Sequence, residues 1–252
     1  MTRRRFFAPP EAFTADGSAA TLSPEETQHL RNVLRLQTGD EIFVFDGAGH
    51  EFRGEISSLA RDQASIRLFE EFAPSCGESP LNLKIAVALL KGEKFDLVIQ
   101  KLAELGVNSV TPITTMRADV RIRNDEDAAR KLTRWRRIAL EAIKQCGRAR
   151  EMIIEKPMSL EDFVARDQES GLRLMFAERG GNGLSEAFAA SEQKPARVTA
   201  LIGPEGGWSD GEIEHAREAR WEIVTLGGRT MRAETAAIIC AALLQHRFGD
   251  LV

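Results

Sequence analysis

The sequence predicts an α/β protein in which a small N-terminal β-barrel domain precedes a larger domain with a parallel β-sheet. Two observations predict this division. Short segments rich in Ile, Val and Phe fill the first 72 residues, whereas apolar runs alternate with segments of helical periodicity after residue 82. Several short strands are typical of a barrel, and strands that alternate with helices are typical of a parallel sheet. We therefore expect a barrel domain over residues 1–72 and a sheet domain over residues 83–252.

The first domain is expected to contain one helix and at least three strands. Ser23 can cap the helix, Pro24 suits its first turn, and Glu26 stands three residues after the cap. The helix should end before Gly39. Strands are expected over Glu41–Phe45, Glu51–Ile56 and Ala64–Phe69. Residues 73–82, with two prolines, one glycine and no periodicity, are expected to be a linker.

The second domain should begin with a strand that is covered on both faces, because Lys84–Leu90 is an almost continuous apolar run. The helix after it has Phe95, Val98 and Leu102 at helical spacing and should stop at Gly106. Further strands are expected over Val110–Ile113, Met152–Ile154, Leu172–Phe176, Val198–Ile202 and Glu222–Leu226. Further helices are expected over Ala128–Cys146, Leu160–Arg166, Leu184–Ala190, Asp210–Ala219 and Thr235–Phe248.

Charge is distributed unevenly along the chain. The formal net charge is −4, but residues 117–150 contain 11 Lys/Arg and 5 Asp/Glu, so this segment carries +6 and the rest −10. A basic segment on an acidic protein favours a polyanion that docks at one place. The alternative is an ordinary solvated helix face.

Composition excludes several other classes of protein. The three cysteines are widely spaced and form no CxxC pair, and the four histidines show no ligand spacing, so no metal site is expected. No run approaches the roughly 20 apolar residues of a membrane span, and no signal peptide is expected at the N-terminus. Reduced thiols and a cytoplasmic location are the simplest interpretation.

Two glycine-rich loops follow consecutive expected strands, at residues 202–208 and 226–236. Ligands of open α/β sheets bind at the carboxyl ends of the strands. In the first loop, glycines surround Pro204-Glu205, and Ser209 with Glu212 forms a capping box that occupies amides of the next helix. The loop lacks the lysine of a phosphate-binding loop, and its only charge is Glu205. A cationic or neutral ligand such as S-adenosylmethionine fits better than ATP, and plain tight turns are the alternative.

These loops resemble the cofactor-binding signature of the SPOUT superfamily of knotted methyltransferases. Within it, the chain is similar to the bacterial family that methylates N3 of a uridine in 16S (small-subunit) ribosomal RNA. Blocks across nearly the whole chain carry this likeness in the family's order: Arg4 to Phe7; His29, Leu30, Val33, Leu34, Arg35, Gly39 and Asp40; Lys91, Gly92, Lys94, Gln100, Lys101, Glu104, Leu105, Gly106 and Pro112; Glu141, Gln145 and Arg148. Gly228 departs from the family, which often has proline there.

The resemblance implies a PUA-like barrel, a trefoil-knotted α/β domain and a homodimer. It implies methyl transfer from S-adenosylmethionine to 16S rRNA, in the small ribosomal subunit, as a step of rRNA processing and ribosome biogenesis. Other RNA substrates (transfer RNA or large-subunit rRNA), a non-catalytic RNA-binding protein and an ordinary doubly wound nucleotide-dependent enzyme remain alternatives.

The chemistry suggests roles for residues near the second loop. N3 of uracil holds its proton at neutral pH, so the enzyme must remove the proton or stabilise the anion that spreads onto O2 and O4. Arg232 and Arg229 are the expected anion-stabilising residues. Glu234 or Glu205 is the expected proton acceptor. The alternative for each is that it fixes a loop by accepting backbone amides, and Glu234 in addition suits the first turn of a helix.

Two further sets of residues complete the expected site. Cofactor contacts are expected from Phe176, Ala177, Ile202, Gly203, Pro204, Glu205, Gly207, Leu226, Gly227, Met231, Thr235 and Ala236. RNA contacts are expected from Arg3, Arg4, Arg5, Lys91, Lys94, Arg121, Arg123, Arg136, Arg148 and Arg150.

Overall fold

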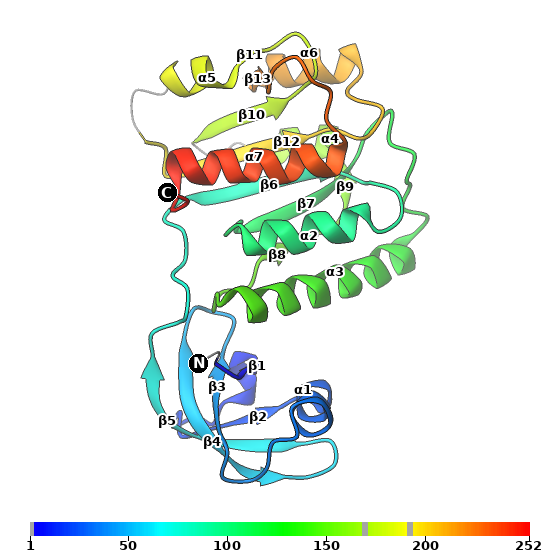
Figure 1. Cartoon of the computed structure of the whole chain (residues 1–252). Helices are drawn as coiled ribbons and strands as arrows, with labels where there is room; N and C mark the ends of the chain where they lie inside the picture. The colour runs from blue at the N-terminus through cyan, green and yellow to red at the C-terminus, as the bar shows by residue number, and fades with distance from the viewer. Residues whose placement is uncertain (1–2, 168–170, 191–193) are drawn as a thin grey trace. The chain divides into compact units, whose positions relative to one another are not determined.

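The computed structural model describes residues 3–167, 171–190 and 194–252 (Figure 1). The chain divides into two compact units. Unit 1 comprises residues 1–78 and 143–151, and unit 2 comprises residues 79–142 and 152–252. The division therefore lies at Glu78/Ser79, inside the expected linker, and the segment Ile143–Glu151 joins unit 1 although it is distant in the sequence. No helix in the described ranges is long and apolar enough to span a membrane.

Unit 1 is built on a five-stranded sheet with the order β1-β3-β4-β5-β2. Its strands are β1 (Arg5–Phe7), β2 (Ala19–Leu22), β3 (Glu41–Phe45), β4 (Glu51–Leu59) and β5 (Ala64–Phe72). The three predicted strands are confirmed, and β4 and β5 extend by three residues beyond their predicted ends. β1 runs parallel to β3, and the other neighbours are antiparallel. Alternate residues such as Ile42, Val44 and Ile56 point into one buried core.

The helical segment of unit 1 is shorter than predicted and changes type. A 3-10 turn (Pro10–Ala12) precedes it, and α1 (Pro24–Gln28) continues directly into a π-helical turn (His29–Val33). The Ser23 hydroxyl accepts a hydrogen bond from the Glu26 N–H at 3.2 Å, which confirms the predicted N-cap. The Glu26 carboxylate binds the Lys144 ammonium at 2.8 Å.

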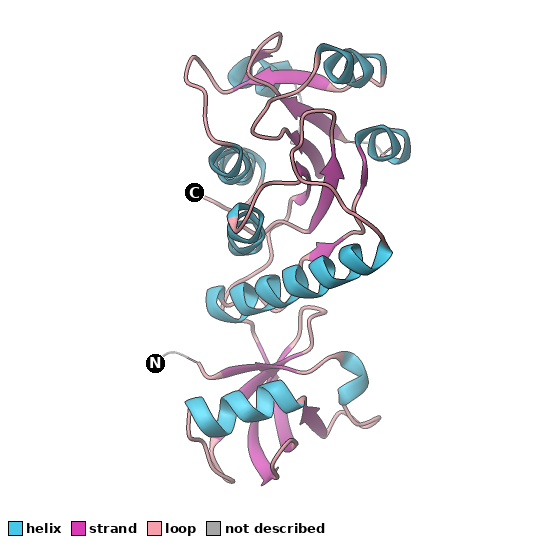
Figure 2. Cartoon of the chain, turned by 90° about the vertical axis from the view of Figure 1, so that its right-hand side faces the viewer, coloured by secondary structure: helices cyan, strands magenta, loops and turns pink. Residues whose placement is uncertain are grey.

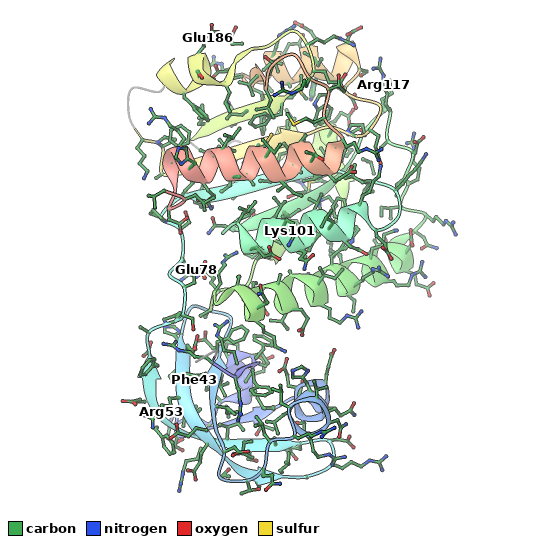
Figure 3. The ribbon with its side chains drawn as sticks, in the orientation of Figure 1. Phe43, Arg53, Glu78, Lys101, Arg117 and Glu186 are labelled. Atoms are coloured by element: carbon green, nitrogen blue, oxygen red, sulfur yellow. The ribbon has the colours of Figure 1, made fainter. Side chains whose placement is uncertain are left out.

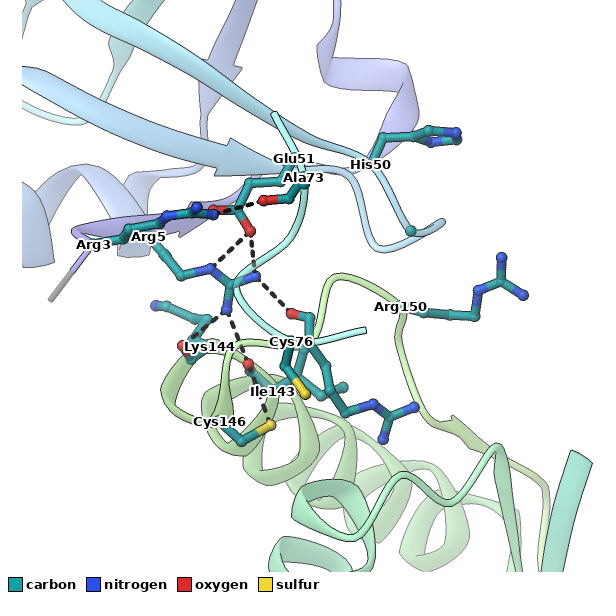
Figure 4. Close-up of polar contacts among 12 residues, drawn as sticks. Arg3, Arg5, His50, Glu51, Ala73, Cys76, Ile143, Lys144, Cys146 and Arg150 are labelled. Carbon is teal, nitrogen blue, oxygen red and sulfur yellow. Dashed lines mark hydrogen bonds and ion pairs between the residues drawn. The ribbon is translucent and has the colours of Figure 1, made fainter. Parts of the chain in front are cut away.

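A buried arginine joins the sheet of unit 1 to the end of the long helix α3 (Asp125–Cys146) (Figure 4). The Arg5 side chain, 5% exposed, donates to the Glu51 carboxylate at 2.8 and 3.1 Å. It also donates to the carbonyl oxygens of Ile143, Lys144 and Arg148 at 2.7–3.1 Å. The last carbonyls of a helix lack partners within the helix, and a cation near them is stabilising.

Arg5→Lys should therefore lower the free energy of unfolding by about 2 kcal/mol. The Arg5 guanidinium makes five hydrogen bonds, and the ammonium of a lysine cannot make all of them. Urea unfolding followed by circular dichroism measures the change. Arg4→Lys is the matched control. Arg4 is the exposed neighbour of Arg5, and its substitution should change the free energy of unfolding by less than about 0.5 kcal/mol. Equal stability of the two variants would contradict the structural role of Arg5.

Unit 2 has a parallel sheet with the order β11-β13-β10-β12-β6-β7-β8, in which β9 also pairs with β7. Its strands are β6 (Asn82–Ala88), β7 (Ser109–Thr114), β8 (Ile153–Ile154), β9 (Met158–Ser159), β10 (Leu172–Phe176), β11 (Asn182–Gly183), β12 (Arg197–Ile202) and β13 (Glu222–Thr225). The six predicted strands of this domain are present, as β6, β7, β8, β10, β12 and β13. The two-residue strands β9 and β11 are too short for a sequence pattern to predict.

Helices cover both faces of this sheet (Figure 2). They are α2 (Lys94–Glu104), the part of α3 up to Ala142, α4 (Leu160–Arg166), α5 (Leu184–Ala190), α6 (Asp210–Glu218) and α7 (Ala233–Phe248). α2 and α7 pack side by side, and α7 lies against β12. On the opposite face, Phe163 of α4 and Ile213 of α6 pack with Met175, Leu201 and other inward residues of the strands. Double coverage explains why β6, β7 and β12 are buried along nearly their whole length.

Candidate active site

The sheet order of unit 2 brings three strand ends together. β10 lies between β12 and β13, with Phe176 paired to both Ile202 and Val224. All three strands run parallel, so the bends that follow them meet at one edge of the sheet. A pocket with about 740 Å³ of free space, partly open to solvent, lies there. It is lined by Phe176, Ala177, Glu178, Ile202, Gly203, Pro204, Gly207, Trp208, Leu226, Gly227, Gly228, Arg229, Thr230, Met231, Ala233 and Ala236.

A buried tryptophan fixes the bend after β12. The Trp208 side chain is almost fully enclosed, and its indole N–H donates to the Phe176 carbonyl oxygen at 2.8 Å. A Cβ atom on Gly203 would lie 3.0 Å from the indole Cε2 and Nε1 atoms. A side chain at position 203 would therefore press against the indole, which packs on the backbone here.

The same bend is held on its outer side by the segment after β7. The Arg117 guanidinium, labelled in Figure 3, donates to the carbonyl oxygen of Trp208 at 3.1 Å and more weakly to that of Gly206 at 3.4 Å. The predicted capping box at the start of α6 is confirmed, since Ser209 and Glu212 exchange hydrogen bonds of 3.2 and 2.8 Å. The loop from β12 to α6 is thus anchored at both its ends.

One lysine lies between two carboxylates beside the pocket. The Lys94 ammonium is 3.0 Å from Glu205 Oε1 and 3.9 Å from Glu234 Oε2. Burial alone would raise the pKa of Glu205, but hydrogen bonds from its own N–H, from Lys94 and from the Lys91 N–H together hold the pKa below its ordinary value of 4.5. The stabilisation from this ion pair is therefore complete above pH 4.5 and is lost as the pH falls through the lowered pKa.

The bend after β13 forms the opposite wall of the pocket. Gly227 has a φ of +102°, which favours glycine at this turn. Arg229 lines the pocket and is exposed. Arg232 is the N-cap residue of α7, and its side chain makes no capping hydrogen bond. Within the described ranges neither guanidinium has an ion pair, so both are available to an anionic partner.

The pocket brings together most of the residues expected to bind a cofactor. Ten of the twelve line it, and the exceptions are Glu205 and Thr235. Of the expected catalytic residues, Arg229 lines the pocket, whereas Arg232 and Glu234 lie beside its lining residue Ala233. Sequence reasoning did not assign five lining residues: Glu178, Trp208, Gly228, Thr230 and Ala233. Each directly follows an assigned residue or lies within the assigned loops. Closeness in sequence to the assigned residues could therefore have identified them.

The residues expected to contact RNA fall into two groups. Five are engaged in ion pairs: Arg3 and Arg5 with Glu51, Arg148 with Glu78, Lys91 with Asp119, and Lys94 with Glu205. The Arg5 and Arg148 side chains are 5% and 2% exposed, which corrects the expectation that they contact RNA phosphates. Five others are exposed and have no ion pair with any described residue: Arg4, Arg121, Arg123, Arg136 and Arg150.

The described part of the chain contains no group of three or more His, Cys, Asp or Glu residues that could hold a metal ion.

Two family models match the chain. A model of an RNA methyltransferase domain covers residues 77–245, and a model of an RNA methyltransferase PUA domain covers residues 22–69. A ribosomal RNA small subunit methyltransferase E from a Synechocystis species is 32% identical over 243 residues, which is 96% of this chain and 77% of the relative. The protein of the same name from Bacillus subtilis is 30% identical over 231 residues, which is 90% of each chain.

Solved structures match over almost the whole length. A methyltransferase from Legionella pneumophila in complex with the cofactor SAM (S-adenosylmethionine) has a TM-score of 0.89 and 34% identity, with full coverage of both chains. A ribosomal RNA small subunit methyltransferase E from Neisseria gonorrhoeae bound to S-adenosylmethionine has a TM-score of 0.87 and 29% identity, covering 99% of this chain and 100% of that one.

Proposed function

The chain belongs to the family of ribosomal RNA small subunit methyltransferases E, and on this premise we propose that it methylates N3 of a uridine in 16S rRNA. It is an S-adenosylmethionine-dependent rRNA methyltransferase. The observation that carries the proposal is the pocket at the adjacent ends of β10, β12 and β13. The substrate also leads us to propose a cytoplasmic location.

The lining of the pocket fits this methyl donor. The pocket lies beyond the carboxyl ends of parallel strands, where small-molecule ligands of α/β sheets bind. Apolar side chains such as Leu226 and Met231 can enclose an adenine ring, while the backbone of the bends offers hydrogen-bonding groups. No lysine lines the pocket, which distinguishes it from a phosphate site. When bound, the donor supplies an electrophilic methyl group.

The protein must make N3 of uracil nucleophilic. We assign this task to Arg229 and Arg232, whose unpaired guanidinium groups flank the bend after β13. A guanidinium near O2 or O4 favours the uracil anion over the neutral base. Glu234 is a weaker candidate for the proton acceptor, because its carboxylate lies beside Lys94 and outside the pocket lining. Methyl transfer then requires only that N3 of uracil and the methyl group of the donor are correctly positioned, since the sulfonium already activates the methyl group.

Lys94 supports the pocket from outside its lining. Lys94→Met should raise the Kd of S-adenosylmethionine about fivefold, because Glu205 and Glu234 would repel each other and the first bend would lose its anchor. Isothermal titration calorimetry measures the change. Lys101→Met, which removes an equivalent ammonium paired with Glu104 on the same helix, is the control and should leave the Kd unchanged. Equal effects of the two variants would show that Lys94 does not hold the bend.

We propose that RNA docks on a set of exposed arginines that form no ion pair with any described residue. Arg121, Arg123 and Arg136 lie in unit 2, and Arg4 and Arg150 lie in unit 1. Guanidinium contacts to phosphates make affinity fall steeply with salt, because bound counterions are released. Arg121→Gln and Arg123→Gln together should reduce the slope of log Kd against log salt by about 2.

We also propose a homodimer that forms through α7. Residues 236–244 of this helix are all apolar, and Ile238, Ile239, Ala242 and Leu243 among them keep exposed area. α7 packs beside α2, where Leu97 is 41% exposed. A contiguous apolar surface of this kind is typical of a subunit interface. Sedimentation equilibrium should give twice the chain mass, and Ile239→Glu should give the monomer.

The proposed reaction is tested by mass spectrometry of ribosomal RNA from cells with and without this protein. We expect one N3-methyluridine in 16S rRNA to disappear with the gene and to return with the wild-type chain. The purified protein must also form the modified nucleoside in vitro, in small subunits from cells that lack the gene. Loss of a methyl group from transfer RNA or large-subunit rRNA alone would assign a different substrate, and no change in any RNA would favour a non-catalytic RNA-binding protein.

A further inference from the structure

The pocket contains two ionised side chains that are not paired with each other or with any other described residue. Glu178 follows the end of β10, and Arg229 lies in the bend after β13. The Glu178 Oε2 atom is 3.6 Å from the position that a Cβ on Gly207 would occupy, so the carboxylate lies beside the first bend. The neighbouring carboxylates Glu205 and Glu234 are held by Lys94 and do not line the pocket. Among the lining residues, Glu178 is therefore the one that has a carboxylate.

The charge of this carboxylate matters because methyl transfer changes the charge of the ligand. The donor has a positive sulfonium, and the product of transfer, S-adenosylhomocysteine, has a neutral thioether in its place. Adenine, ribose, amino group and carboxylate are the same in both molecules. Contacts to these shared groups change both affinities equally and cancel in the ratio of the two dissociation constants. Only a group that senses the sulfonium charge alters this ratio.

We propose that Glu178 is a specificity-determining residue that makes the pocket prefer the cationic donor to the neutral product. Its carboxylate attracts the sulfonium charge, and the attraction ends when the methyl group leaves, which favours product release. Arg229 acts in the opposite sense, because a guanidinium in the same pocket repels the sulfonium. The inference rests on the proposed function, since it requires S-adenosylmethionine to bind in this pocket.

The solvent exposure of the Glu178 side chain determines how strongly its charge affects the ratio of dissociation constants. Glu178 is exposed to solvent at the edge of the pocket, so water and salt screen its field. We therefore expect a change of about fivefold in the ratio of dissociation constants, which corresponds to about 1 kcal/mol. Screening also makes the effect depend on salt, so it should shrink between about 0.05 M and about 1 M NaCl.

The test is calorimetric titration of the full chain with S-adenosylmethionine and, separately, with S-adenosylhomocysteine. In Glu178→Gln the ratio Kd(product)/Kd(donor) should fall about fivefold at low salt. In Arg229→Gln the same ratio should rise. Glu218→Gln, on the exposed side of α6, changes the net charge by the same amount as Glu178→Gln and should leave the ratio unchanged.

The outcomes separate this inference from the proposed function. If the wild-type chain binds neither ligand, the proposed cofactor site itself is wrong. If both ligands bind the wild-type chain but Glu178→Gln weakens them equally, Glu178 contacts a shared group such as the amino group, and the inference is overturned. An unchanged ratio in Glu178→Gln, with circular dichroism showing a native fold, overturns it as well.

Discussion

Arg232→Ala is expected to lower kcat about 100- to 1,000-fold and to leave the Kd of S-adenosylmethionine almost unchanged. The guanidinium is exposed at the N-cap of α7, next to the lining residue Ala233, but it is not part of the pocket lining itself. The cofactor therefore does not need it, whereas a uracil that approaches the pocket would place O2 or O4 near this group. Removing one preorganised group that stabilises developing negative charge typically has an effect of this size.

Single-turnover kinetics with 16S rRNA in small subunits measures the effect on the chemical step. The rate of Arg232→Ala should recover partly at high pH, because hydroxide then generates the uracil anion that the arginine no longer stabilises. Arg232→Lys should restore part of the rate by keeping the charge. Arg137→Ala, which removes an exposed guanidinium from α3, is the control for net charge. Near-normal turnover of Arg232→Ala at neutral pH would remove this residue from the catalytic site and leave Arg229 as the remaining candidate.

Gly203→Val is expected to weaken binding of S-adenosylmethionine more than about 100-fold. A Cβ atom at this position would already lie 3.0 Å from the indole of Trp208, and the two methyl groups of valine require more space still. The indole must move, and it would then lose its hydrogen bond to the Phe176 carbonyl oxygen. Because Gly203, Trp208 and Phe176 all line the pocket, the displacement deforms the wall of the site directly.

Calorimetric titration with S-adenosylmethionine measures this loss, and thermal unfolding shows how much of it comes from the fold. Gly211→Val is the matched control, since nothing lies within 4 Å of a Cβ atom built at Gly211. Gly203→Ala should give an intermediate affinity, because a single carbon demands a shift of only a few tenths of an ångström. Unchanged affinity of Gly203→Val would mean that the cofactor does not bind between the two bends.

The pocket and the buried arginines differ in how much of each is predictable from the sequence. The pocket is made of short continuous segments, and each segment follows a strand whose apolar run is visible in the sequence. Ten of its lining residues are therefore among the cofactor contacts that the sequence predicts. Sequence reasoning omitted Glu178 and Trp208 because a carboxylate or an indole after a strand end has no local pattern that assigns it to a ligand site.

The basic residues that form ion pairs show the opposite case. Arg5, Arg148 and Lys94 have the sequence context of RNA-binding residues, but each binds a carboxylate that is distant in the chain. Arg5 and Glu51 are separated by 46 positions, and Lys94 and Glu205 by 111. Charge density along the sequence gives the number of cations and not their partners. The trefoil knot likewise stays a prediction of the family resemblance.

The sequence by itself determined the alternation of strands and helices, the Ser23 and Ser209 caps, and the two bends at consecutive strand ends. These features depend on periodicity and turn chemistry within a few residues. Only the tertiary structure decided that β10 lies between β12 and β13, that Glu178 lines the pocket, and which of the predicted RNA-binding cations form ion pairs with described carboxylates. Those outcomes depend on which distant segments pack together, and packing is a property of the whole fold.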